Sequence, residues 1–139
     1  MEYSAKIIKD ENCYLVSFVD FPNVMTFGDT IEEALSNASE ALNGALESDF
    51  ERGYELPTPT EKDGDDYYKV SILAHIEISY ELRQMRVQKT QTQIEIASML
   101  GVSYQAYQKL ENPRKCNPTI KTLEKISSVL GKKLEVSFC

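Results

Sequence analysis

The stretch that most constrains this chain lies between residues 92 and 112, where two short helical patterns meet at a sharp corner. The inward residues of the first pattern fall within an arc of about 100° on a helix of period 3.6; they are Ile96, Ala97 and Leu100. Gly101 follows directly, and glycine can adopt the left-handed conformation that ends a helix. Ser103 can then cap a second helix by accepting a backbone N–H. These features predict a helix-turn-helix.

The second helix of this pair divides into two faces. Ala106, Tyr107 and Leu110 share the face that is predicted to pack inward. The other face carries long polar side chains, which can match the donors and acceptors of base edges in the major groove. We therefore predict DNA contacts by Ser103 at the helix start and by the exposed face, which consists of Tyr104, Gln105, Gln108 and Lys109. An ordinary amphipathic hairpin is the alternative, but the small Ala97 at the helix crossing favours the DNA-binding interpretation.

Two more helices are expected around this motif. One runs from Ile72 to about Gln88, and the cations near its end suit a helix C-terminus and could approach phosphate; they are Arg83, Arg86 and Lys89. The other begins after Thr119 and ends at Gly131. Its predicted inward residues are Ile120, Leu123, Ile126, Val129 and Leu130.

The connections in this half supply further candidate contacts with DNA. Thr92 is the expected cap of the helix that begins at Gln93. The segment 112–118 has two prolines and adjacent cations, which suit phosphate contacts that position a protein without reading sequence. Its predicted DNA-binding residues are Asn112, Arg114 and Lys115.

The C-terminal residues 134–138 alternate between apolar and polar side chains, as in a strand. No other strand is expected in this half to pair with it, and an unpaired apolar strand is an aggregation hazard. The simplest partner is the same segment of a second copy, and two-fold dimers suit palindromic DNA sites. We therefore predict a homodimer or higher oligomer formed through the C-terminal domain.

Charge divides the chain into two parts of opposite sign. Residues 1–77 carry 5 Lys and Arg against 17 Asp and Glu, a balance of −12, and residues 78–139 carry 10 against 5, a balance of +5. We predict two domains, at residues 1–75 and 76–139. The chain has no apolar stretch of membrane-spanning length and no signal-peptide pattern, so we expect a cytoplasmic protein. Its three cysteines are widely spaced, which suits free thiols in a reducing compartment.

The acidic half has the pattern of an α+β domain in the order β-β-β-α-β. The predicted strands are residues 3–9, 13–19, 24–27 and 67–73. A long helix begins after Thr30, with Glu33 as the partner of a capping box, and ends near Gly53. We expect its apolar face to cover the sheet; that face is Ile31, Leu35, Ala38, Leu42, Ala45 and Leu46. The proline-containing segment 57–66 is expected to make few contacts.

The basic half resembles the Cro/C1 family of helix-turn-helix repressors. The resemblance rests on Gln93, on residues 95–97 and 100–103, on residues 110–112, and on the stretch from Pro118 to Leu130. Gln93 occupies the position where that family places a glutamine that touches the DNA backbone. The resemblance thus implies an all-α DNA-binding domain, followed here by the short C-terminal strand.

The acidic half resembles the HicB family of antitoxins over about residues 1–60. The segments that carry this resemblance are residues 14–22, residues 26–35 and the positions Ala38, Ala41 and Leu42. The resemblance implies a partial ribonuclease-H-like fold. It also implies an antitoxin that binds a HicA-like ribonuclease toxin, blocks its access to RNA and represses the operon encoding the pair. The alternative is a transcriptional repressor whose acidic domain senses a small ligand and has no toxin partner.

An enzyme is a remote third interpretation. The carboxylates of the acidic half that could hold magnesium each have a local use in a turn or at a helix start; they are Asp10, Glu11, Asp20, Asp29 and Asp49. A two-metal site needs several carboxylates at one point, and their spacing does not require this. His75 has no cysteine or second histidine at ligand spacing. We expect no catalysis, no metal site and no cofactor.

Overall fold

The computed structural model describes residues 1–138, which divide into two compact units. The first unit is Met1–Glu77 and the second begins at Ile78. The division lies within helix α2, Ala74–Gln88, two residues beyond the predicted boundary at residue 75. None of the helices in residues 1–138 combines the length and hydropathy that crossing a bilayer requires.

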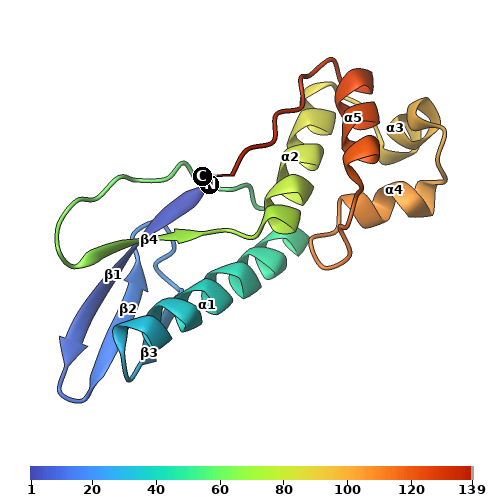
Figure 1. Cartoon of the computed structure of the whole chain (residues 1–139). Helices are drawn as coiled ribbons and strands as arrows, with labels where there is room; N and C mark the ends of the chain where they lie inside the picture. Colours follow the sequence, from blue (N-terminus) through green and yellow to red (C-terminus); the bar gives the residue numbers. More distant parts are fainter. Residues whose placement is uncertain (139) are drawn as a thin grey trace. The chain divides into compact units, whose positions relative to one another are not determined.

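The first unit is built on a four-stranded antiparallel sheet in the order β3-β2-β1-β4 (Figure 1). Its strands are β1, Glu2–Asp10, β2, Cys13–Phe18, β3, Met25–Gly28, and β4, Tyr67–Ser71. β1 and β2 form the predicted hairpin, in which Asp10 faces Cys13 and Glu11 takes a positive φ of 52° in the two-residue turn. The α+β order predicted for this half is confirmed.

Helix α1, Ile31–Glu51, packs along one face of this sheet. Thr30 caps it by accepting the Glu33 N–H at 3.0 Å, as the sequence predicts. The closest approach of helix and sheet is at Gly28, where an added Cβ would lie 2.4 Å from the Ala34 nitrogen. The buried face is therefore centred slightly differently from the prediction; it consists of Ala34, Ala38, Leu42, Asn43 and Leu46. Ile31, Leu35 and Ala45 are only partly buried.

The connection between α1 and β4 does not match its prediction. We call residues 57–61 the strap, because hydrogen bonds tie this segment to the sheet. The Tyr3 hydroxyl donates to the Pro57 carbonyl at 2.7 Å, and the Ser4 hydroxyl donates to the Thr60 carbonyl at 3.2 Å. The Asp20 carboxylate accepts the Thr60 N–H at 2.9 Å and the Thr60 hydroxyl at 2.6 Å. The segment that was expected to make few contacts is wrong in this respect, since long-range polar partners hold it.

The second unit consists of helices. After α2 come α3, Gln93–Leu100, α4, Tyr104–Leu110, and α5, Ile120–Val129. Their shared core includes Leu82 of α2, Tyr107 of α4 and Ile126 of α5. It also contains three residues of α3 that the sequence predicts to be inward, namely Ile96, Ala97 and Leu100.

Three predictions for the second unit need correction. Ala106 and Ile120 were expected to face inward, but both are exposed, because a seven-residue helix and the first turn of α5 each bury only a narrow stripe. Residues 134–138 form no strand in the single chain. The reason is that a strand needs an edge to pair with, and the described part of this unit contains helices and loops only.

Candidate DNA-binding surface and the ion pair behind it

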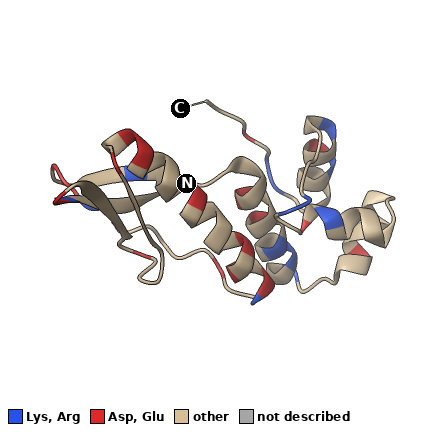
Figure 2. Ribbon diagram, turned by 90° about the horizontal axis from the view of Figure 1, so that it is seen from below, with Lys and Arg blue, Asp and Glu red and all other residues tan. Residues whose placement is uncertain are grey.

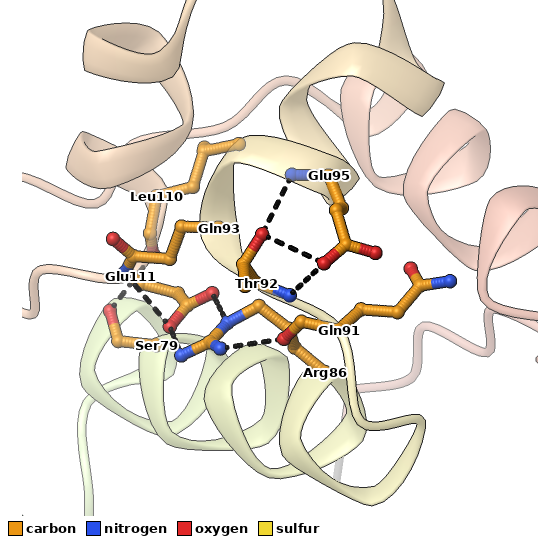
Figure 3. Close-up of polar contacts among 8 residues, drawn as sticks. All are labelled: Ser79, Arg86, Gln91, Thr92, Gln93, Glu95, Leu110 and Glu111. Carbon is orange, nitrogen blue, oxygen red and sulfur yellow. Dashed lines mark hydrogen bonds and ion pairs between the residues drawn. The ribbon is translucent and has the colours of Figure 1, made fainter.

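The corner between α3 and α4 is set by caps that the sequence predicts. Thr92 and Glu95 form a complete capping box at the start of α3, in which each side chain bonds the backbone of the other (Figure 3). Gly101 ends α3 in the left-handed conformation, with φ of 70°. Ser103 caps α4 by accepting the Ala106 N–H at 3.1 Å. The two helices of the motif therefore have defined ends.

Helix α4 presents the polar face that the sequence predicts. Tyr107 is fully buried and anchors the helix to the core. The exposed residues of α4 include Tyr104, Gln105, Gln108 and Lys109. Since the four share one side of the helix, they offer a surface of amide, ammonium and phenol groups. Their contact with DNA stays a prediction.

A buried ion pair lies behind this surface. The Arg86 guanidinium of α2 grips the Glu111 carboxylate with two bonds, Nε to Oε2 at 2.7 Å and Nη2 to Oε1 at 3.0 Å. The side chain of Glu111 is only 1% exposed. Gln93 Nε2 donates to Glu111 Oε1 at 3.2 Å, and Arg86 Nη1 donates to the Gln91 carbonyl at 2.9 Å. Figure 3 shows these bonds joining α2, the start of α3 and the end of α4.

The electrostatics of this cluster follow from its burial. The hydrogen bond to Glu111 raises the pKa of Arg86 above its ordinary value, although desolvation opposes the rise. Burial raises the pKa of the Tyr107 phenol, and the nearby Glu111 carboxylate adds to the effect. Arg86 therefore stays charged and Tyr107 stays neutral across the physiological pH range.

The structure changes the interpretation of several predicted contact residues. Arg86 was expected to be able to approach phosphate, but it is committed to Glu111 because a buried carboxylate requires a partner. The amide nitrogen of Gln93 is likewise engaged by Glu111. Asn112 Oδ1 accepts the Arg114 N–H at 3.0 Å, which shapes the loop after α4. The side chains of Arg114 and Lys115 are exposed in that loop.

Sequence reasoning assigned no structural role to Glu111, although a signal was available. Glu111 follows Tyr107 by four residues, so the two side chains lie on the same side of a helix. A charged residue at an inward position calls for an opposite charge, and Arg86 lies on a neighbouring helix.

A hollow of about 510 Å³ opens beside the start of α3. Its lining includes Thr92, Gln93 and Ile94 from the start of α3 and Tyr104 from α4. The first turn of a helix leaves backbone N–H groups without partners within the helix, and these groups favour anions. The beginning of α3 and the exposed face of α4 therefore adjoin one surface that suits a phosphate chain.

Comparison with known proteins agrees with this two-unit architecture. Residues 2–79 match the family described as HicB_like antitoxin of bacterial toxin-antitoxin system, and residues 82–136 match the helix-turn-helix family. This chain belongs to the HicB-like antitoxin family. Its boundary between matches falls within α2, close to the division between the two units.

Individual relatives cover nearly the whole of this HicB-like chain. Antitoxin HicB 2 of Photorhabdus laumondii is 35% identical over 136 residues, which is 98% of this chain and 95% of that protein. Antitoxin HicB of Escherichia coli strain K12 is 29% identical over 126 residues, which is 91% of this chain and 90% of that protein. The crystal structure of the N-terminal domain of Burkholderia pseudomallei antitoxin HicB is 27% identical, covers 52% of this chain and 99% of that chain, and has a TM-score of 0.47.

The first unit of this HicB-like antitoxin carries the negative charge. Figure 2 shows Asp and Glu on its hairpin, along α1 and on the connection that follows α1. Within residues 1–138, no group of three or more His, Cys, Asp or Glu side chains is placed to hold a metal ion. Asp20, one of the carboxylates considered as a magnesium ligand, instead bonds Thr60 of the strap.

The ion pair behind the DNA-binding surface generates a stability prediction. Replacing Glu111 with Ala leaves the Arg86 guanidinium partly buried without its carboxylate, which costs about 3–5 kcal/mol in the free energy of unfolding. Urea denaturation followed by circular dichroism measures this loss.

A matched control is the exposed Lys133–Glu135 pair, whose side chains are 85% and 81% exposed. Glu135→Gln should change stability little, because exposed pairs are well solvated and screened. Equal, small losses for Glu111→Ala and Glu135→Gln would show that the buried pair does not hold the helices together.

Proposed function

We propose that this HicB-like antitoxin binds and inhibits a small basic ribonuclease of the HicA kind and represses the operon that encodes the pair. The observation that carries the proposal is the joining, in one chain, of an acidic antitoxin-family unit to a helix-turn-helix with a polar exposed helix face. An antitoxin that inhibits and represses needs both kinds of surface.

The charge of the first unit supports its role toward a ribonuclease. A protein that grips RNA presents cations to the phosphate backbone. A unit with a balance of −12 is attracted to such a face and can occupy it in place of RNA. The partner is therefore a basic protein, and the attraction depends on ionic strength.

The second unit supports the role toward DNA. In the proposed complex α4 lies in the major groove, and Gln105 and Lys109 contact base edges. The cations of the loop after α4, Arg114 and Lys115, contact phosphates. The chain binds operator DNA as a homodimer or higher oligomer, since two copies are needed for a palindromic site.

The DNA-binding proposal predicts different effects for two kinds of substitution. Gln105→Ala should cost about 1–3 kcal/mol on the operator and much less on random DNA, because base contacts carry specificity. Lys115→Ala should weaken binding to both DNAs and flatten the salt dependence, since it removes a phosphate contact. Titration of labelled operator and scrambled DNA at several salt concentrations checks this. Equal losses on both DNAs for Gln105→Ala would contradict the assignment of the exposed face.

The antitoxin proposal predicts inhibition of the ribonuclease encoded beside this gene. The full chain should abolish RNA cleavage near a one-to-one ratio of binding sites, and inhibition should weaken as salt rises, because screening acts beyond about 8 Å at physiological ionic strength. Gln105→Ala should inhibit as well as the unmodified chain, since it lies in the DNA-binding unit. A chain that binds operator but leaves RNA cleavage unchanged would instead favour a repressor without a toxin.

Oligomerisation through the C-terminal domain is proposed from the segment 134–138. Val136 is 61% exposed and Phe138 is fully exposed in the single chain, and the alternating pattern suits pairing with a second copy. Removing residues 133–139 should lower the mass measured by sedimentation and weaken operator binding, because linking two half-sites raises the effective concentration of the second. An unchanged mass would exclude this segment as the interface.

A further inference from the structure

The face of the sheet opposite α1 carries a row of apolar side chains. Ile8 of β1 faces Leu15 of β2, and Leu15 faces Phe27 of β3, so the three form a line across three strands. Met25, two residues before Phe27, points to the same face. We call these four residues the outer-face patch. Their exposed fractions are 45% for Ile8 and Leu15, 72% for Met25 and 60% for Phe27.

The patch is the part of this face that the strap leaves uncovered. Ser4 lies on the same side of β1 as Ile8, but it is only 1% exposed because it bonds Thr60 and Lys69. The strap leads toward β4, while β3 is at the opposite edge of the sheet. One half of the face is therefore closed by the chain itself, and the apolar half is open to a partner.

The partner of the patch lies on the face and does not extend the sheet. β3 is an edge strand of four residues, and Asn37 Nδ2 donates to the Phe27 carbonyl at 2.8 Å. This bond occupies a backbone acceptor that an added strand would use. Side-chain contacts with Phe27 and Leu15 remain fully accessible to a protein that packs on the face.

Charges at the margin of the patch indicate the chemistry of that partner. Asp10 and Glu11 lie at the hairpin beside Ile8 and Leu15, and three acidic residues follow Phe27; they are Asp29, Glu32 and Glu33. The cations nearby on β1 are Lys6 and Lys9. The margin is thus negative, and a second copy of this unit would bring one balance of −12 against another. A basic partner gains attraction from the same margin.

We propose that the outer-face patch is the surface on which the basic ribonuclease docks, with Phe27 and Leu15 as the central anchors. The inference rests on the proposed antitoxin function and assigns that function to a surface. Apolar and aromatic anchors at the centre of an interface carry most of its binding energy, while charges at the margin mainly raise the association rate.

The exposed face of α1 is the competing surface for the same partner. Glu32, Ser36, Glu40 and Gly44 are exposed along it, so it is acidic as well. However, no large apolar side chain of α1 is among the exposed residues of the described chain. This face offers attraction without an anchor, and Glu40→Gln distinguishes it from the patch.

The test measures binding of the full-length chain to the neighbouring ribonuclease, inactivated at its catalytic residue, by surface plasmon resonance. Phe27→Ala and Met25→Ala are separate patch variants, and both residues are exposed enough for the fold to survive the change. Tyr54→Ala is the matched control, because Tyr54 is 56% exposed on the same unit but lies outside the patch. Circular dichroism confirms that each variant is folded.

Phe27→Ala should weaken binding at least 10-fold through faster dissociation, Met25→Ala should weaken it severalfold, and Tyr54→Ala should leave it unchanged. Glu11→Gln should slow association at low salt and leave dissociation unchanged.

The outcomes separate the inference from the proposed function. If the unmodified chain does not bind the ribonuclease, the proposed function fails and the inference fails with it. If it binds and the two patch variants bind equally well, the inference alone is overturned, and a loss with Glu40→Gln then assigns binding to α1. A lower oligomer mass for Phe27→Ala with unchanged ribonuclease affinity would identify the patch as a contact between copies and would also overturn the inference.

Discussion

The DNA-binding surface depends on the bidentate bond between Arg86 and Glu111. Helix α4 has only seven residues, and a helix that short is unstable unless packing supports it. Tyr107 anchors its inner side, and Glu111, directly after its last residue, is held by Arg86 of α2 and Gln93 of α3. The exposed side chains of α4 are therefore oriented by groups that DNA never touches, which is the arrangement a precise recognition surface requires.

The first unit uses the same device on a sheet. Asp20 bonds Thr60, and the buried hydroxyls of Tyr3 and Ser4 bond strap carbonyls, so one half of the outer face is closed by polar contacts. Burial raises the pKa of Tyr3 to about 12, with Asp20 and Glu77 adding to the effect. The phenol therefore remains a donor to the strap at neutral pH. The closed half defines the open one, because the strap leaves the row from Ile8 to Phe27 exposed.

Local chemistry was predictable from the sequence, and long-range polar pairing was not. The caps at Thr30, Thr92 and Ser103 and the helix end at Gly101 depend on residues within four positions, and all four match the structure. The bond between Asp20 and Thr60 spans 40 positions, and that between Arg86 and Glu111 spans 25. Hydrophobic periodicity says nothing about such pairs, and for the same reason the strap was taken for a loose loop. The C-terminal strand illustrates a third case, since a strand forms only where an edge exists.

The opposite charges of the two units allow one chain to serve two opposite kinds of partner. With an overall charge of −7, an evenly charged protein would be repelled by DNA. Electrostatic interaction is screened beyond about 8 Å at physiological ionic strength, so a phosphate near Lys109 or Lys115 is governed mainly by the charges of the second unit. A basic protein near Phe27 is governed in the same way by the charges of the first unit. Segregation along the sequence thus becomes segregation in space, and lowering the salt concentration reduces it because each partner then senses the whole chain.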